Sequence, residues 1–344
     1  MLTYILKRLL LMIPTILGVL TLTFVIIQFV PGGPVETILA EARAGAGGDT
    51  ASYQARRDVD AKQVEELKKL YGFDKPPLER YVSMLKSFAV FDLGKSYLRN
   101  KDVWSLIKEK LPVSVSLGLW TFLLTYLISI PLGVAKAVRE GTRFDTLTTL
   151  LVLVGYAIPG FVLGVLLIVL FAGGTFLDWF PLRGLVSDNW ASLSWPARIA
   201  DYLWHLVLPL ICYAIGSFAV VTMLTKNTFV EEIRKQYVLV ARAKGLSQRR
   251  ILYKHVFRNA LIPIVTGFPA AFVGAFFASS LLIETMFSLD GLGLLGYESI
   301  VRRDYAVVLG TLYFFTLIGL VVKLIGDLLY VVVDPRVQFG AVAK

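Results

Sequence analysis

Six segments of this 344-residue sequence contain no Asp, Glu, Lys or Arg, and each is 18 to 32 residues long. About 20 consecutive apolar residues let a helix cross the hydrocarbon core of a bilayer. The composition agrees, because 56% of the residues are hydrophobic and only 17% are charged, against about 25% charged in soluble domains. The sequence therefore predicts an all-α integral membrane protein with six transmembrane helices. The segments are Leu9–Val35, Leu111–Ala135, Thr146–Leu177, Tyr202–Thr225, Asn259–Ile283 and Tyr305–Val322.

The first segment follows Lys7 and Arg8, as the apolar region of a signal peptide would. It is longer than the roughly 7–15 residues of such a region, and Gln28–Pro31 lacks the small residues of a cleavage site. We interpret it as a retained transmembrane helix. Cys212 is the single cysteine of the sequence, so no disulfide within the chain is expected.

Charge placement predicts the orientation of the helices, because cytoplasmic loops of membrane proteins carry an excess of Lys and Arg. Residues 226–258 contain nine basic and two acidic side chains, and 136–145 contain three and two. Residues 178–201 and 284–304 each contain two basic side chains, with three and four acidic ones. The prediction is that both termini are cytoplasmic and that a large external loop, 36–110, follows the first helix. The excess of Lys and Arg in cytoplasmic loops then explains the net charge of +10, and no nucleic-acid partner is predicted.

Local structure is expected outside the membrane as well. In the long external loop, Ala44–Gly48 is expected to be flexible, and Val64–Leu70 and Leu78–Phe88 are expected to be short helices. Part of 188–204 is expected to lie on the outer membrane surface, because tryptophan gathers at membrane interfaces. Four of the six tryptophans lie near it: Trp179, Trp190, Trp195 and Trp204.

Two matches to nucleotide-binding motifs fail in their context. Leu93–Ser96 resembles the end of a P-loop, but the first glycine of that motif is missing. Gly291, Gly293 and Gly296 spell G-x-G-x-x-G, but no strand precedes them and no βαβ unit surrounds them. The chain is therefore predicted not to be an enzyme.

Ionisable residues within the apolar helices are rare. Lys323 and Asp327 lie one helical turn apart, where they can neutralise each other, and we interpret them as a structural ion pair. Glu284 is expected at the outer end of the fifth helix, with the interface or a loop in reach. His205 and His255 fall on opposite sides of the predicted membrane, which excludes a shared site. Acidic pairs are expected only in solvated loops.

Small residues recur every four positions in the fifth apolar segment. They are Gly267, Ala271, Ala275 and Ser279. This spacing lets helix backbones approach closely. Packing within this chain, packing against a second membrane subunit and the lining of a pathway all remain open.

The cytoplasmic segment 226–258 is longer than a topology signal requires. Within it, Tyr237–Lys244 has helical composition, Gly245 can end that helix, and Ser247 can cap a second one. Small residues such as Ala241 would let the short helix enter a groove of a partner. A plain basic loop explains the segment as well.

In this segment the sequence resembles the permease subunits of bacterial ABC importers, in their oligopeptide and dipeptide (binding-protein-dependent) family. Ala241–Ser247, His255 and Arg258–Pro263 are similar to the peptide-permease form of the "EAA loop", with Leu239–Val240 in place of Glu-Ala. Other similar segments, most like the Yej-type branch, are Asp92–Ser96, Leu111–Pro112, Ile130–Gly133, Phe180–Leu185, Lys226–Phe229, Glu284–Phe287 and Gly291–Gly293.

The resemblance implies a type I ABC importer transmembrane domain in a bacterial inner membrane. It divides the chain into a first helix (1–35), a periplasmic loop (36–110), a five-helix permease core (111–333) and a cytoplasmic tail (334–344). The implied partners are a homologous permease subunit forming a heterodimer, a cytoplasmic ABC ATPase with two nucleotide-binding domains, and a periplasmic peptide-binding protein. ATP and Mg would be bound by the ATPase, with no cofactor in this chain. The implied substrates are oligopeptides, including peptide antibiotics such as microcin C.

The resemblance also implies residue roles. The helix that couples to the ATPase would include Tyr237, Ala241, Arg242, Lys244, Gly245, Leu246 and Arg250. A periplasmic gate or receptor contact would include Glu284, Phe287, Gly291 and Gly293. Ala241 and Gly245 are expected to face the ATPase, so that Ala241→Glu and Gly245→Asp would abolish transport and leave the chain stable in the membrane.

Three alternatives remain. An ion-coupled secondary transporter should show intramembrane acids or broken helices. A membrane scaffold would not need a docking loop. An ABC permease for another substrate, such as nickel chelates, differs only in specificity.

Overall fold

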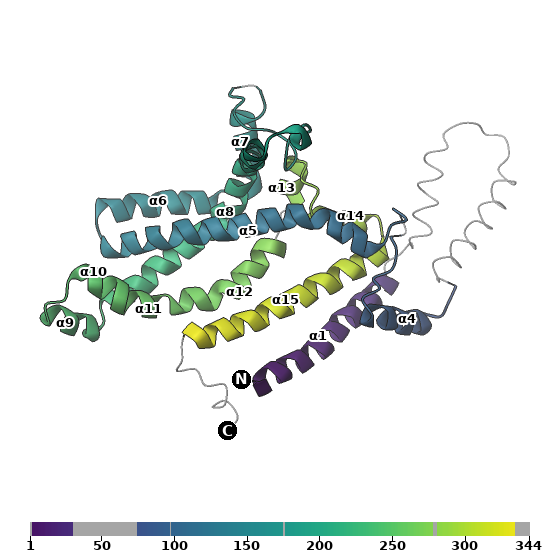
Figure 1. The fold of residues 1–344 in the computed structure, drawn as a ribbon, viewed down its shortest axis with the longest axis horizontal. Helices are drawn as coiled ribbons and strands as arrows, with labels where there is room; N and C mark the ends of the chain where they lie inside the picture. Colours follow the sequence, from purple (N-terminus) through teal and green to yellow (C-terminus); the bar gives the residue numbers. More distant parts are fainter. Residues whose placement is uncertain (1, 30–73, 97, 175, 278–280, 334–344) are drawn as a thin grey trace. The chain divides into compact units, whose positions relative to one another are not determined.

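The computed structural model describes residues 2–29, 74–96, 98–174, 176–277 and 281–333 (Figure 1). Regular structure in these residues is helical, and their only strand-like feature is an isolated bridge between Lys95 and Asp102. The all-α prediction is therefore confirmed for the described part of the chain. The expected flexible stretch Ala44–Gly48, the expected helix Val64–Leu70 and the tail 334–344 lie outside the described residues.

Four of the described helices are long and apolar enough to cross a membrane. They are α1 (Leu2–Phe29), α5 (Val103–Val138), α8 (Trp195–Ile233) and α15 (Tyr305–Val333). Two bent pairs are also apolar enough to form one span each. The first joins α6 (Arg143–Ala157) to α7 (Gly160–Phe171), and the second joins Gln248–Ala260 to α12 (Ile262–Phe277). The number of spans among the described residues reaches six only if each pair forms one.

The third apolar segment is not the single helix that the sequence predicted, because α6 and α7 meet at 97°. Proline has no backbone N–H, and its ring disfavours helical geometry in the residue before it. Ile158, which precedes Pro159, is extended with φ −87° and ψ 119°. The helix therefore ends at Ala157 and a new one begins at Gly160.

The remaining helices are short. The helix α4 (Pro77–Ala89) confirms the prediction over Leu78–Phe88. The others are η1 (Trp190–Ser192), α9 (Gln236–Ala243), α10 (Gln248–Arg250), the π-helical turn η2 (Ile251–Val256), α11 (Phe257–Ala260), α13 (Leu281–Met286) and α14 (Leu292–Val301).

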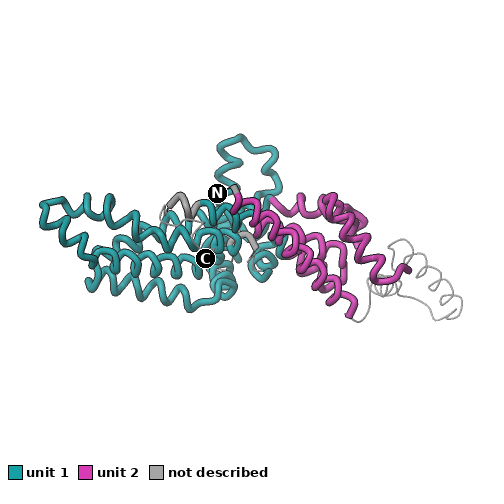
Figure 2. Tube along the Cα trace, turned by 90° about the horizontal axis from the view of Figure 1, so that it is seen from below, with its two compact units in different colours: residues 1, 112–293, 321–344 teal, residues 2–111, 294–320 magenta. Residues whose placement is uncertain are grey.

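The chain divides into two compact units, coloured separately in Figure 2. Unit 1 comprises residue 1, 112–293 and 321–344, and unit 2 comprises 2–111 and 294–320. The long helices α5 and α15 each contribute to both units.

In unit 2, α4 is fastened to α1. The hydroxyls of Thr21 and Tyr81 lie 2.6 Å apart, and the rings of Phe24 and Tyr81 lie 5.3 Å apart. Arg80 Nη2 donates to Gln28 Oε1 at 2.7 Å. The described part of the predicted external loop therefore includes a helix that packs on the first apolar helix.

The Asp92–Ser96 motif has a structural role in unit 2. Gly94 has a φ of +76°, which glycine adopts without steric cost, and its N–H donates to Asp92 Oδ1 at 3.0 Å. The loop places the fully buried Ser96 hydroxyl against the buried carboxylate of Asp304, to which it donates. The motif thus joins the segment before α5 to the start of α15.

Two apolar clusters form the core of unit 1. The first joins α5, α8, α9, η2, α11 and α12, and includes Phe122, Phe229, Val238 and Val256. The second joins α5, α7, α8 and α13, and includes Leu117, Leu206, Cys212 and Phe287. We call them the α9-side core and the α7-side core. Because α5 and α8 contribute residues to both clusters, these two helices connect the two cores of the unit.

The small residues of α12 are divided between two environments. Ala271 packs against the α9-side core. A Cβ atom at Gly267 or Gly274 would meet no atom within 4 Å. Side chains 275–280 are not described, so the choice between packing and pathway stays open.

The tryptophan-rich segment of unit 1 is held by its own polar groups. Trp190 Nε1 donates to the carbonyl of Arg198 at 3.1 Å, and the Arg198 guanidinium lies 5.0 Å from the Trp190 ring centre. Trp195, Trp179 and Trp204 are exposed. Contact of 188–204 with a membrane surface stays a prediction.

Candidate docking surface around α9

The helix α9 has the local sequence signals of a short, sharply ended helix. Gly245 has a φ of +74°, where a side chain is disfavoured, and its N–H donates to the Arg242 carbonyl at 2.9 Å. The Ser247 hydroxyl accepts from the N–H of Arg250 at 3.4 Å and caps α10. The predicted helix over Tyr237–Lys244, its end at Gly245 and the cap at Ser247 are confirmed.

One face of α9 is inserted into unit 1. Val238 is fully buried and Ala241 is 8% exposed, and both belong to the α9-side core. Residues three apart lie on the same face of a helix. Leu239 and Val240 point the other way, with 57% and 53% exposure. A short helix therefore presents two large apolar side chains to its surroundings.

The expectation for Ala241 was wrong. Its small side chain packs among the residues of this chain and is not on the exposed face. Ala241→Glu would bury a charge within the α9-side core, which destabilises the chain itself. This substitution therefore cannot separate docking from folding, and Leu239 is the informative position.

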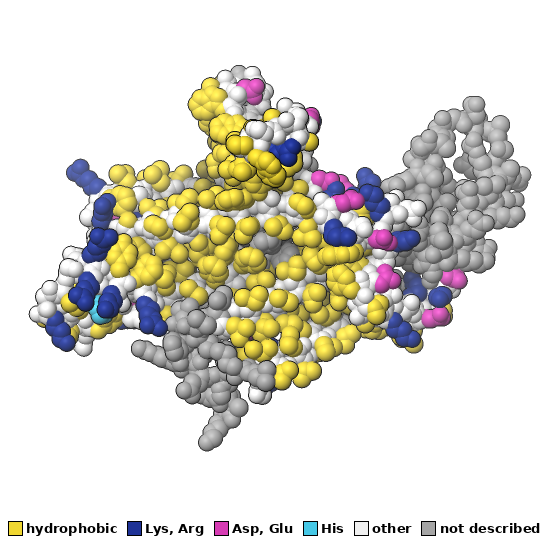
Figure 3. All heavy atoms as spheres, in the orientation of Figure 1, with side chains coloured by type: hydrophobic (Ala, Val, Ile, Leu, Met, Phe, Trp, Pro, Cys, Tyr) yellow, Lys and Arg dark blue, Asp and Glu magenta, His cyan; other side chains and the backbone are white. Residues whose placement is uncertain are grey.

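All but one of the residues predicted beyond Ala241 are exposed. Arg242, Lys244, Gly245 and Arg250 are exposed, and Leu246 packs against the α9-side core. Figure 3 shows Lys and Arg side chains gathered around α9, α10 and α11. An apolar centre within a charged rim is the usual composition of a protein–protein contact.

Tyr237 fastens α9 to the rest of unit 1. Its hydroxyl donates to Glu232 Oε2 at 2.8 Å and lies 3.5 Å from the His255 carbonyl oxygen. Burial and the bond to Glu232 raise the pKa of the Tyr237 phenol. Glu232 also accepts from Lys235, and this hydrogen bond raises the pKa of Lys235. The end of α8 and the start of α9 are thus joined by a buried carboxylate.

A cavity of about 310 Å³ lies beside the inserted face of α9. The π-helical turn η2 contributes Ile251, Leu252, Tyr253 and Val256 to its lining. Turns of this kind are rare and occur often at functional sites. The helix α9 therefore borders a hollow and is not packed tightly on every side.

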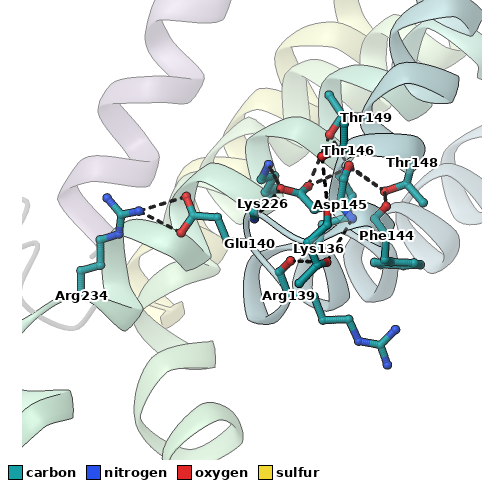
Figure 4. Close-up of polar contacts among 12 residues, drawn as sticks. Lys136, Arg139, Glu140, Phe144, Asp145, Thr146, Thr148, Thr149, Lys226 and Arg234 are labelled. Atoms are coloured by element: carbon teal, nitrogen blue, oxygen red, sulfur yellow. Dashed lines mark hydrogen bonds and ion pairs between the residues drawn. The ribbon is translucent and has the colours of Figure 1, made fainter.

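A buried cluster of charges lies elsewhere in unit 1 (Figure 4). Lys136 is fully buried, and its Nζ lies 3.2 Å from Asp145 Oδ1. Lys226 Nζ lies 2.7 Å from Asp145 Oδ2. The sequence predicted solvated loop charges here, and this is wrong because α5 continues to Val138 and α6 begins at Arg143.

The predicted gate residues are packed inside unit 1. Glu284 is fully buried and packs against the loop at Gly291, one of the two environments expected for it, and Phe287 is 1% exposed. A Cβ at Gly291 would lie 2.7 Å from Glu284 Oε1, so only glycine leaves room for the carboxylate. The N–H of Leu292 donates to the Ser114 hydroxyl at 2.8 Å. Gly293 is half-buried, and a gating role for these residues stays a prediction.

Lys323 and Asp327 lie one turn apart on α15. Lys323 is exposed and Asp327 is half-buried. Pairing of these two side chains stays a prediction. Among the residues that the structure describes, no group of three or more His, Cys, Asp or Glu side chains is placed to hold a metal ion.

Comparison with known proteins gives a consistent set of similarities. Residues 129–339 match the family described as "Binding-protein-dependent transport system inner membrane component". The chain is 53% identical to the "Peptidoglycan transport system permease protein YejB" of Agrobacterium fabrum and 51% identical to the "Inner membrane ABC transporter permease protein YejB" of Escherichia coli O157:H7, with 98% of each chain covered. It is 33% identical to the "Oligopeptide transport system permease protein AppB" of Bacillus subtilis, covering 98% of this chain and 100% of that protein.

Proposed function

Since this chain belongs to the family of binding-protein-dependent transport system inner membrane components, we propose that it is the membrane-spanning subunit of an ATP-driven importer for oligopeptides. The family description and the permease names of its relatives support an inner-membrane transport role. ATP hydrolysis is assigned to a partner ATPase, which binds the ATP and Mg. A second permease subunit and a periplasmic peptide-binding protein complete the proposed complex.

The exposed apolar face of α9 carries the proposal. Leu239 and Val240 are more than half exposed on a helix whose opposite face is buried in the same chain. In water this exposure is unfavourable, by roughly 25 cal/mol for each Å² of apolar surface. A partner that covers the face would remove this surface from water. We propose that this partner is the ATPase, with Arg242, Lys244 and Arg250 at the rim of the contact.

The proposed topology places both termini and α9 in the cytoplasm, and the α7–α8 connection on the periplasmic side. It rests on the nine-to-two excess of basic side chains in 226–258. The test uses single cysteines in a Cys212→Ser background. In intact cells with a permeabilised outer membrane, an impermeant thiol reagent is expected to label the exposed positions Asp188 and Asp290 but not Lys244. Labelling of Lys244 before lysis would overturn this topology.

Transport is expected to depend on ATP and not directly on an ion gradient. In proteoliposomes that hold this chain with its ATPase, second permease and binding protein, ATP should drive accumulation of a labelled tripeptide without an imposed gradient. The chain reconstituted alone should take up no peptide after a pH step. Uptake driven by a pH step without the ATPase would support the ion-coupled carrier instead.

Competition in the same proteoliposomes distinguishes substrate classes. Unlabelled oligopeptides are expected to reduce accumulation of the labelled tripeptide, whereas a nickel chelate is expected to leave it unchanged. A peptide derived from peptidoglycan is the second candidate, because the relative with 53% identity is named for peptidoglycan transport. Microcin C tests whether a modified peptide is accepted.

A further inference from the structure

The buried charges of unit 1 join three helices at one point. Lys136 lies in the last turn of α5, Asp145 in the first turn of α6, and Lys226 in α8. Their side chains are 0%, 7% and 15% exposed. A buried charge that lost its partner would be strongly unfavourable. The three helices are therefore held in one arrangement by groups that cannot separate without a large energetic cost.

Lys136 and Asp145 each have several partners, and Lys226 binds Asp145. Lys136 Nζ donates to the Asp145 carbonyl at 3.0 Å, to Thr148 Oγ1 at 2.8 Å and to Thr149 Oγ1 at 2.6 Å. Asp145 Oδ2 accepts from Lys226 and from the N–H of Gly141. The cluster is thus a buried network of hydrogen bonds and ion pairs centred on Asp145.

The helix ends explain why two lysines share one aspartate. The C-terminal end of a helix carries partial negative charge and the N-terminal end carries partial positive charge. Lys136 stands at the end of α5, and Asp145 stands at the start of α6. The carbonyl groups at the end of α5 therefore offset part of the excess positive charge.

Next to the cluster, the backbones of α5 and α8 touch. A Cβ atom at Gly133 would lie 2.8 Å from the Thr222 carbonyl oxygen and 2.5 Å from Thr225 Cβ. Gly133 is one turn before Lys136, and Thr225 directly precedes Lys226. Little relative sliding of the two helices is possible where the cluster lies.

The cluster is continuous with the proposed docking helix. From Lys226, α8 runs on to Ile233 and includes Glu232, which binds Tyr237 of α9. Val134 and Ala137 of α5 belong to the same α9-side core as Val238 and Ala241 of α9. A displacement of α9 therefore reaches α8 through a partly buried hydrogen bond and reaches α5 through packed side chains.

We propose that Lys136, Asp145 and Lys226 are positioning residues that make α5, α6 and α8 move with α9 as one body when the ATPase acts. The proposal rests on the docking role of α9 proposed above. The lysines act through Asp145, to which both are bound. Loss of the cluster is expected to uncouple ATP hydrolysis from transport without releasing the ATPase.

The main experiment measures peptides transported per ATP hydrolysed by the full complex in proteoliposomes. Asp145→Asn and Lys226→Met are expected to lower this ratio about tenfold, within the usual range of coupling between sites, and to leave the amount of bound ATPase unchanged. The ratio for the double variant should be no lower than that for the more affected single variant, because both substitutions break the same interaction.

The exposed pair between Arg234 and Glu140 is the matched control. Arg234 Nη2 lies 2.8 Å from Glu140 Oε2, and it links the end of α8 to the α5–α6 turn at the surface, with 69% and 40% exposure. Because exposed pairs contribute little, at roughly 0–1 kcal/mol, Arg234→Ala is expected to keep the wild-type ratio. An equal loss in Arg234→Ala would overturn the special role of the buried cluster.

Spin labels provide a readout that needs no transport. They are attached at Arg143 and Gln236, both exposed, in a Cys212→Ser chain within the complex. One narrow distance distribution, unchanged by ATP, is expected with the native cluster. In Asp145→Asn the distribution should broaden or shift with ATP. Failure of peptide transport by the wild-type complex would refute the proposed function, and the spin labels would still test the cluster.

A purely structural cluster would give a different result. Asp145→Asn would then lower the amount of folded chain while the transport ratio and the label distances stayed as in the wild type. That outcome would refute the positioning role.

Discussion

Replacement of Leu239 by Glu is expected to abolish peptide transport while the chain remains in the membrane at nearly wild-type amounts. Leu239 is 57% exposed and lies opposite the buried face of α9, so the substitution places no charge within this chain's core. It would place an unpaired charge in the centre of the proposed contact with the ATPase. Hot-spot residues, which cluster near the centre of an interface, contribute about 2 kcal/mol or more, and a loss of this size corresponds to roughly 30-fold weaker binding. The measurement is ATPase co-purified per permease, together with peptide uptake.

Two variants of the same helix serve as controls. Gln236→Glu adds the same charge at an exposed position in the first turn, where the helix dipole favours an acid, and should retain transport. Ala241→Glu should reduce the amount of folded chain, because Ala241 lies in the α9-side core. If Leu239→Glu bound the ATPase and transported peptide as the wild type does, α9 would not be the docking helix.

Replacement of Gly133 by Val is expected to prevent unit 1 from folding normally. A Cβ there would lie 2.5 Å from Thr225 Cβ and 2.8 Å from the Thr222 carbonyl, so α5 and α8 would have to separate. Overpacking of this kind costs about 1–3 kcal/mol, and more where backbone is in the way. Each 1–2 kcal/mol lowers the folded-to-unfolded ratio by a factor of roughly 5–30. The readout is the monodisperse fraction in mild detergent and its melting temperature.

Gly216 of α8 is the matched control for Gly133. No atom lies within 4 Å of the Cβ that a substitution would add there. Gly216→Val should therefore leave both measurements near those of the wild type. A similar loss in the two variants would mean that valine disturbs these helices in general and that the close approach of α5 to α8 is not the cause.

The sequence predicted well those features that depend on neighbouring residues. Apolar runs predict helices because a segment that crosses a bilayer needs about 20 apolar residues in a row, and only a helix satisfies the backbone hydrogen bonds of such a segment within itself. Gly245 and Ser247 were correctly identified because helix ends depend on backbone conformation and on short-range hydrogen bonds. Pro159 could have signalled the break in the third segment, but a long apolar run dominated that interpretation.

Features that depend on distant residues were missed. Lys136 looked like a loop charge because it follows an apolar run, yet it is buried against Asp145, whose other ion-pair partner, Lys226, is 81 residues away from it in the sequence. Ala241 looked like a docking residue because it is small, but the position of the core decides which face of α9 is buried. Without an alignment or a structure, such pairings cannot be read from residue types alone.

The break at Pro159 bears on how the chain enters the membrane during synthesis. Helices of 15 and 12 residues are about 22 and 18 Å long, and neither crosses a hydrocarbon core of about 30 Å alone. Backbone groups freed at the bend must find partners inside protein, because lipid offers none. The start of α7 lies against the backbone of α8, where a Cβ at Gly160 would be 2.5 Å from the Cys212 carbonyl oxygen. Since α8 is synthesised later, the bent pair can reach its final place only after the ribosome has released the helix that follows it.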